Sequence, residues 1–153
     1  MNALELLKED HEKVDQLFQK VKADEDADHK DTFEQIKTEL EIHTHIEETI
    51  FYPRLVEEGD EELKDITLEG IEEHRQAKMF LRELSSLTDD SEKFKPKLQV
   101  LMEDIEHHVQ EEEGEMFPMI QEQFDEATLQ ELGKEMEKEK KSFGKSGRAA
   151  SGK

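Results

Sequence analysis

In a pattern that occurs twice in this sequence, a histidine is followed four residues later by a glutamate: His43 by Glu47, and His108 by Glu112. Residues four apart lie on one face of an α-helix, one turn apart, so each pair can present an imidazole and a carboxylate to the same point. Both pairs also fall within the apolar stripe of their segment, which would place them inside a helical bundle. Burying such groups is costly unless an ion ligates them. The pairs therefore indicate a metal centre.

The same pattern occurs in both halves of the chain. A further histidine, directly after an acidic residue, precedes each pair: Asp10-His11 in the first half and Glu73-His74 in the second. Such a repeat is typical of a duplicated helical hairpin that carries equivalent residues at matching depths. The sequence thus predicts that four imidazoles and two carboxylates meet at one level of a bundle.

Other polar residues near these motifs are predicted to lie away from the centre. On an ideal helix His45 is about 200° and Tyr52 about 180° around from His43, so His45 would face water and Tyr52 would be peripheral. His107 is offset by about 100° from the adjacent His108.

Four amphipathic segments carry the apolar stripe of a helix, at about residues 2–22, 33–53, 61–87 and 96–118. Short polar turns separate them, so the predicted fold class is all-α, an antiparallel up-down-up-down four-helix bundle over residues 1–124. A short extra C-terminal helix is expected at 125–141, because its apolar positions are too few for a core of its own. The Gly, Ser and basic residues of 142–153 predict a disordered tail.

The composition limits the chemistry. The chain has 153 residues, enough for one domain, with 41% charged residues and a net charge of −21. It contains no cysteine, so any metal must be held by nitrogen and oxygen. The acidic surface disfavours nucleic acid as a partner. No signal peptide precedes the first helix and no apolar run approaches the roughly 20 residues that span a bilayer, so we expect no membrane association and a cytoplasmic location.

A ferritin-like di-iron bundle is the nearest structural alternative. That class places Glu-x-x-His motifs on two helices and a single glutamate on each of the others. In this sequence no histidine has a glutamate three residues before it, and the order of the two residues is reversed. The ferritin-like class is therefore disfavoured.

The motifs resemble those of the hemerythrin-like (HHE cation-binding) domain proteins. Four stretches look like that family's signatures in the same order, at residues 9–11, 43–53, 72–74 and 107–118. The resemblance covers residues 1 to about 124, and the combination of four motifs is specific where one alone would be weak. It implies a site for two non-haem iron ions. In that site four histidines would bind end-on and two glutamates would bridge the ions: His11, His43, His74 and His108, with Glu47 and Glu112.

Iron is implied by the resemblance alone, since Mn or Zn would also suit imidazole and carboxylate ligands. Lys78 stands four residues after His74, where oxygen-carrying hemerythrins have a fifth histidine. This departure disfavours simple oxygen carriage and favours open coordination positions. The expected function is binding of, or reaction with, O₂, NO or H₂O₂, including peroxidase-like, catalase-like or NO-related turnover. The alternatives are iron storage without turnover and a metal-free structural bundle. The oligomeric state is not predicted.

Overall fold

The structure, a computed structural model, describes residues 1–88 and 90–151, with side chains described up to residue 143. All of the regular secondary structure in these residues is helical. The segments are α1 (Ala3–Ala23), α2 (Lys30–Ile46), η1 (Glu47–Phe51), α3 (Tyr52–Glu58), α4 (Glu61–Ser85), α5 (Phe94–Glu111), η2 (Glu112–Met116), α6 (Phe117–Gln123) and α7 (Glu126–Ser151).

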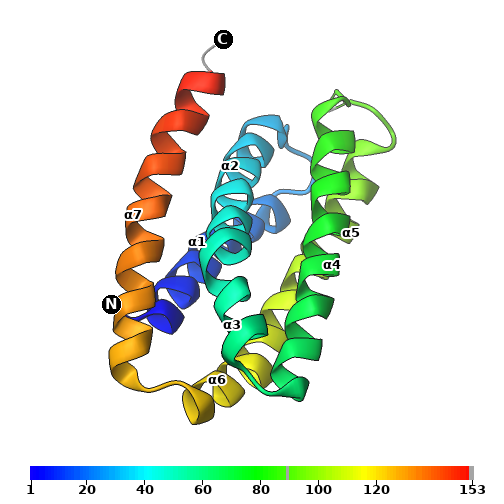
Figure 1. The fold of residues 1–153 in the computed structure, drawn as a ribbon. Helices are drawn as coiled ribbons and strands as arrows, with labels where there is room; N and C mark the ends of the chain where they lie inside the picture. The colour runs from blue at the N-terminus through cyan, green and yellow to red at the C-terminus, as the bar shows by residue number, and fades with distance from the viewer. Residues whose placement is uncertain (89, 152–153) are drawn as a thin grey trace.

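Consecutive segments join into two continuous helical rods, α2-η1-α3 and α5-η2-α6. With α1 and α4 they form an antiparallel four-helix bundle, and α7 lies along its outside against α1 and α2 (Figure 1). The predicted fold class is thereby confirmed.

Polar caps fix where two of the helices begin. The Asn2 side chain accepts a hydrogen bond from the Glu5 amide and the Glu5 carboxylate accepts one from the Asn2 amide, both at 2.9 Å, which is a capping box. Asp60 caps α4 in the same way, accepting from the Leu63 amide at 2.9 Å. These caps set the register of the helices that carry His11 and His74.

Each rod passes through a proline without ending there. The sequence predicts that Pro53 kinks or ends its helix, whereas the structure continues to Glu58 through the π-helical turn η1. In this turn the Tyr52 amide donates to the Glu47 carbonyl, five residues back. A π-turn holds one residue more than an α-turn, so it rotates every residue that follows it by about 100°. Tyr52 therefore shares the face of Glu47.

The bundle interior has three layers. One apolar cluster fills the end near the α3 and α6 segments, with Leu7, Phe51 and Leu55 among its members. A second fills the opposite end and includes Phe18 and Phe33. Histidines and carboxylates occupy the level between the two clusters, so the polar layer is closed by apolar packing above and below.

Helix α7 extends to Ser151, whereas the expected accessory helix ends at residue 141 and is followed by a disordered tail over 142–153. Within this helix Phe143 stacks on His45, with ring centroids 4.2 Å apart and planes 19° apart. His45 also lies 2.8 Å from the Glu139 carboxylate, so it is half-buried beneath α7 rather than facing water as predicted. Residues 152–153 lie outside the described part of the chain.

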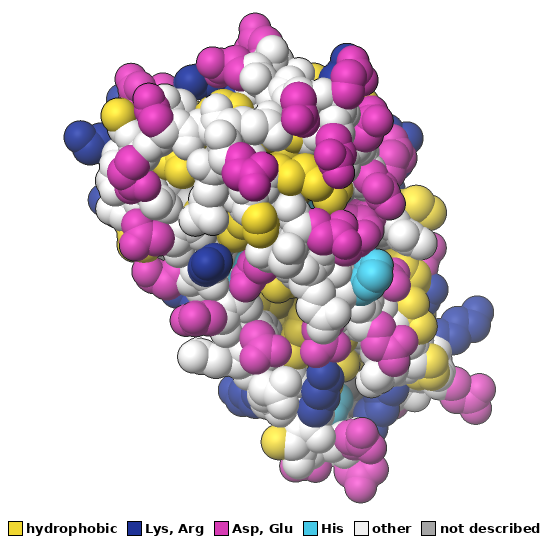
Figure 2. All heavy atoms as spheres, turned by 90° about the horizontal axis from the view of Figure 1, so that it is seen from below, with side chains coloured by type: hydrophobic (Ala, Val, Ile, Leu, Met, Phe, Trp, Pro, Cys, Tyr) yellow, Lys and Arg dark blue, Asp and Glu magenta, His cyan; other side chains and the backbone are white. Residues whose placement is uncertain are grey.

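Acidic side chains cover much of the end of the molecule that is seen in Figure 2, interspersed with smaller numbers of basic ones. Among the described helices, none has the length and hydropathy that crossing a membrane requires.

Candidate metal centre

The structure brings all six predicted ligand residues together in the polar layer. They form two groups with ligand atoms close enough for one ion each: His11, His43 and Glu112 in one, and Glu47, His74 and His108 in the other. The imidazole rings are paired, with centroids 4.9 Å apart for His11 and His43 and 5.0 Å for His74 and His108. All six side chains are buried.

Each central carboxylate contacts histidines of both groups. One oxygen of Glu47 lies 3.0 Å from Nε2 of His43 and 3.1 Å from Nε2 of His74. Glu112 also contacts both groups, but with a different oxygen for each. Its Oε1 is 3.1 Å from Nε2 of His11, and its Oε2 is 3.3 Å from Nε2 of His108. The carboxylates therefore span the two groups.

A second carboxylate stands behind every one of the four histidines. The Nδ1 atom of His11 is 2.5 Å from Glu113, and that of His74 is 2.8 Å from Glu48. A carboxylate can only accept a hydrogen bond, so Nδ1 carries the proton and the Nε2 lone pair is directed at the centre. Such outer carboxylates fix the orientation of metal-binding histidines and increase their basicity.

The remaining two histidines have the same arrangement. Nδ1 of His43 is 3.2 Å from Asp10, and Nδ1 of His108 is 2.6 Å from Glu73. In each case the acid precedes a different ligand histidine in the sequence. Successive helical residues are about 100° apart, so the neighbour of an inward residue faces the adjacent helix.

The donor set fits a cation because most of its inner atoms have no hydrogen-bond partner. Nε2 of His11 and His43, both oxygens of Glu47 and Oε1 of Glu112 are buried without one. Several lie only 3.0–3.1 Å from another of these atoms, but without hydrogen-bonding geometry. Unpaired buried polar atoms are costly. A cation shared by them would remove that cost.

Electrostatics in the centre are dominated by these mutual contacts. Burial alone would lower the pKa of His43. The charge of Glu47 and the hydrogen bond to Asp10 have the larger effect and raise this pKa from 6.5 to about 10. Burial raises the pKa of Glu112, yet the close contacts and charges of His108 and His11 outweigh it and hold that pKa well below its usual value. Without an ion, His43 therefore carries a second proton, on Nε2 as well as on Nδ1.

Tyr52 lies in the centre, contrary to the prediction that it is peripheral. It is fully buried, and its hydroxyl donates to Oε2 of Glu112 at 2.6 Å and is 3.5 Å from Nε2 of both His74 and His108. The prediction was wrong because it assumed an uninterrupted α-helix across η1. Burial and the adjacent carboxylates raise the pKa of Tyr52 well above its usual value, so the hydroxyl keeps its proton.

Lys78 lies on the outer side of His74. Its ammonium group is 2.7 Å from Oε1 of Glu48, whose other oxygen contacts Nδ1 of His74, and its side chain is 47% exposed. The lysine therefore supports the carboxylate behind a histidine and does not point at the ligand atoms.

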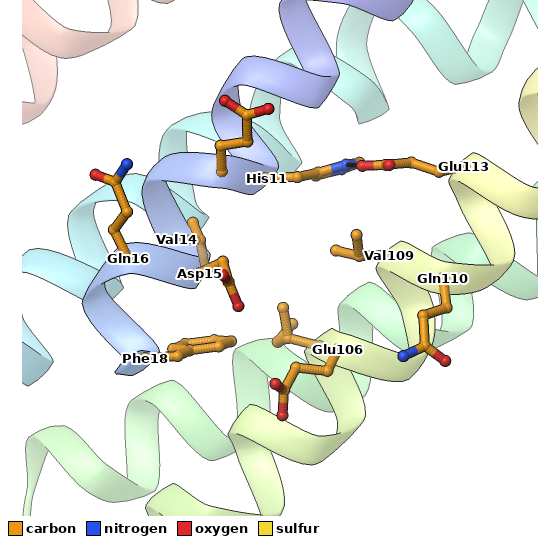
Figure 3. A pocket seen from close by; sticks show the side chains of 11 residues that line it. His11, Val14, Asp15, Gln16, Phe18, Glu106, Val109, Gln110 and Glu113 are labelled. Carbon is orange, nitrogen blue, oxygen red and sulfur yellow. Dashed lines mark hydrogen bonds and ion pairs between the residues drawn. The ribbon is translucent and has the colours of Figure 1, made fainter. Parts of the chain in front are cut away.

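A hollow of about 390 Å³ between α1 and α5 reaches the centre at His11. Figure 3 shows His11 and Glu113 pointing toward each other across its inner end. Val14, Phe18 and Val109 give it an apolar lining, and the carboxylates around it include Asp15 and Glu106.

The four outer carboxylates were not identified from the sequence. A signal for them does exist, because each directly adjoins a predicted ligand: Asp10, Glu48, Glu73 and Glu113. For Tyr52 no signal exists in an ideal helical projection.

Comparison with known proteins agrees with this geometry. The family model described as "Hemerythrin HHE cation binding domain" matches residues 2–120. A crystal structure of a hemerythrin HHE cation binding domain-containing protein from Mycobacterium kansasii superposes with a TM-score of 0.80 at 28% identity, covering 95% of this chain and 89% of that one.

Two curated relatives are similar at 29% identity. One is an uncharacterized hemerythrin-like protein of Schizosaccharomyces pombe, matched over 133 residues that make up 86% of this chain. The other is a protein named DNA nickase from Nostoc sp., matched over 124 residues or 78% of this chain. The chain spans 66% and 34% of the lengths of these two proteins.

The chain is thus an all-helical bundle in which buried histidines and glutamates form two groups that could each hold a cation. Since the family model spans nearly the whole bundle, the chain belongs to the hemerythrin HHE cation-binding family.

Proposed function

We propose that the centre holds two non-haem iron ions, one in each group of three residues. The observation that carries this proposal is that Glu47 and Glu112 each contact histidines of both groups, as bridging carboxylates must. His11 and His43 would bind one ion end-on through Nε2, and His74 and His108 the other. Mn or Zn could occupy the same ligands, because nitrogen and oxygen donors suit all three metals.

We further propose that this centre binds or reacts with O₂, NO or H₂O₂. A bound iron pair would supply the redox chemistry, and the protein supplies binding, orientation and electrostatics. The apolar clusters on either side exclude bulk water from the polar layer. The Tyr52 hydroxyl, whose proton is donated to Glu112, is a polar group beside the ligand atoms of the second group.

The hollow between α1 and α5 is the proposed entry for such ligands, since it reaches His11 and has an apolar lining. Its carboxylates repel anions, so neutral molecules such as O₂, NO and H₂O₂ are favoured over charged ones. With these ligands, the proposed role is in oxidative or nitrosative stress or in iron handling. The proposed location is the cytoplasm.

The test is elemental analysis of protein from iron-supplemented cells, together with optical spectra before and after O₂, NO and H₂O₂ are added. Two irons per chain and a spectral change with one of these ligands are expected. Many irons per chain would instead indicate storage. A colourless protein without metal would contradict the proposal and favour a structural bundle.

A further inference from the structure

The second half of the chain repeats the His-x-x-x-Glu spacing a second time, one residue earlier. His107 and Glu111 stand directly before His108 and Glu112, so α5 carries two such pairs offset by about 100°. The inner pair points into the bundle. The outer pair faces the surface toward α4, with His107 67% and Glu111 30% exposed.

Glu73 on α4 completes this outer group. One ligand atom from each of Glu73, His107 and Glu111 lies within 4.8 Å of the others, close enough to contact one ion. The carboxyl groups of Glu73 and Glu111 lie close enough to interact, and the charge of Glu69 acts on Glu111 as well. An imidazole with two or more carboxylates is a donor set for divalent Zn, Mn or Fe.

A small cavity, here called the passage, lies against both this outer group and the centre. It has a volume of about 10 Å³, comparable to one water molecule, and its lining includes Glu73 and Glu111 of the outer group and His108 and Glu112 of the centre. Gly70 forms part of its wall, and a Cβ atom there would lie 3.5 Å from Cε1 of His108. A methyl group at residue 70 would therefore take up part of the passage.

Glu73 links the two sites directly. One of its oxygens accepts the hydrogen bond from Nδ1 of His108, while its carboxylate also belongs to the outer group. The corresponding positions in the first half, one residue before His43 and Glu47, are Ile42 and Ile46, which cannot bind a cation. The outer group is therefore a feature of one half only and not part of the duplicated centre.

We propose that Glu73, His107 and Glu111 form an outer site for a divalent cation, through which metal ions enter the centre. The site is independent of which metal the centre holds, whereas its role in loading rests on the proposed function. The acidic group would concentrate cations at the mouth of the passage, and exchange of ligands at Glu73 would bring an ion next to His108.

The site is tested by calorimetric titration of the iron-loaded chain with Zn²⁺. The native protein is expected to bind one Zn²⁺ more than His107→Ala or Glu111→Gln. Glu103→Gln is the matched control, because Glu103 is an exposed residue of α5 outside the group and its loss removes the same charge. Equal Zn²⁺ counts in the native protein and His107→Ala would overturn the site.

The loading role is tested by mixing the metal-free chain with Fe²⁺ and following incorporation with time. Filling in His107→Ala is expected to be slower on the order of tenfold than in the native protein or Glu103→Gln, with the same final content of the centre. Equal filling rates would overturn the loading role. A failure of the proposed centre would show differently, as iron content that Glu47→Gln leaves unchanged.

Discussion

Tyr52 and Phe117 occupy equivalent positions in the two halves of the bundle, each five residues after a central glutamate and directly after a π-helical turn. Tyr52 stacks on His74 with centroids 5.2 Å apart, and Phe117 stacks on His11 at 6.3 Å. Only Tyr52 has a hydroxyl, so Glu112 has a hydrogen-bond donor where both oxygens of Glu47 have none. The two halves of the centre are therefore chemically unequal.

Tyr52→Phe should destabilise the metal-free protein by about 1.5–3 kcal/mol, because it removes a hydrogen bond to an ionised carboxylate while keeping the ring that stacks on His74. Chemical denaturation of both metal-free proteins measures the change. The ion count of the loaded protein should stay the same. Equal unfolding free energies would show that the 2.6 Å contact contributes nothing to stability.

Phe117→Tyr is the reciprocal change and should give Glu47 the donor it lacks. If the new hydroxyl reaches Glu47, the metal-free protein gains stability, by about 0.5–1.5 kcal/mol for one additional hydrogen bond. The same denaturation experiment tests this, and a loss of stability would mean that the two halves are not equivalent around residue 117.

Glu47→Gln should reduce the metal content from two ions per chain to one or none, because this carboxylate contacts histidines of both groups. Elemental analysis after dialysis against a weak chelator measures the ratio. Glu57→Gln, at an exposed position of the same rod, controls for the loss of charge. Two ions retained in Glu47→Gln would refute the bridging assignment.

The metal-free protein should lose stability as the pH rises from about 6.5 to about 10. The pKa of His43 is about 10 in the folded state, above its ordinary value of 6.5. Its protonation therefore stabilises the fold fully below pH 6.5, and that contribution disappears as the pH passes 10. Denaturation at a series of pH values tests this. The loaded protein should lack the decline, since an ion replaces the proton on Nε2.

Gly133→Ala should destabilise the protein, because a Cβ atom at this position of α7 would lie 2.3 Å from the Met1 carbonyl oxygen. Separating α7 from α1 to admit the methyl group should cost about 1–3 kcal/mol, as in other overpacked contacts. Gly114→Ala is the control, since a Cβ there meets nothing within 4 Å. Thermal unfolding of both variants should show a lower Tm for Gly133→Ala alone.

The fold and the cluster of six residues were predictable because both depend on helical periodicity. The apolar stripe defines the bundle, and spacing by four places His43 with Glu47 and His108 with Glu112 on one face. The position of Tyr52 was not predictable in this way, because η1 shifts the helical phase after Glu47. The surroundings of His45 also escaped prediction, since they depend on α7, which adds its contacts from a distant part of the sequence.

The crossed arrangement of carboxylates has a consequence for how the chain assembles. Glu47 and Glu48 of the first hairpin contact His74 of the second, and Glu112 and Glu113 of the second contact His11 of the first. Neither hairpin alone contains a complete ligand group with its outer carboxylates. Ion binding would thus act as a non-covalent crosslink between the hairpins. When the hairpins separate, both ligand groups would be lost, even while each hairpin keeps its own helices.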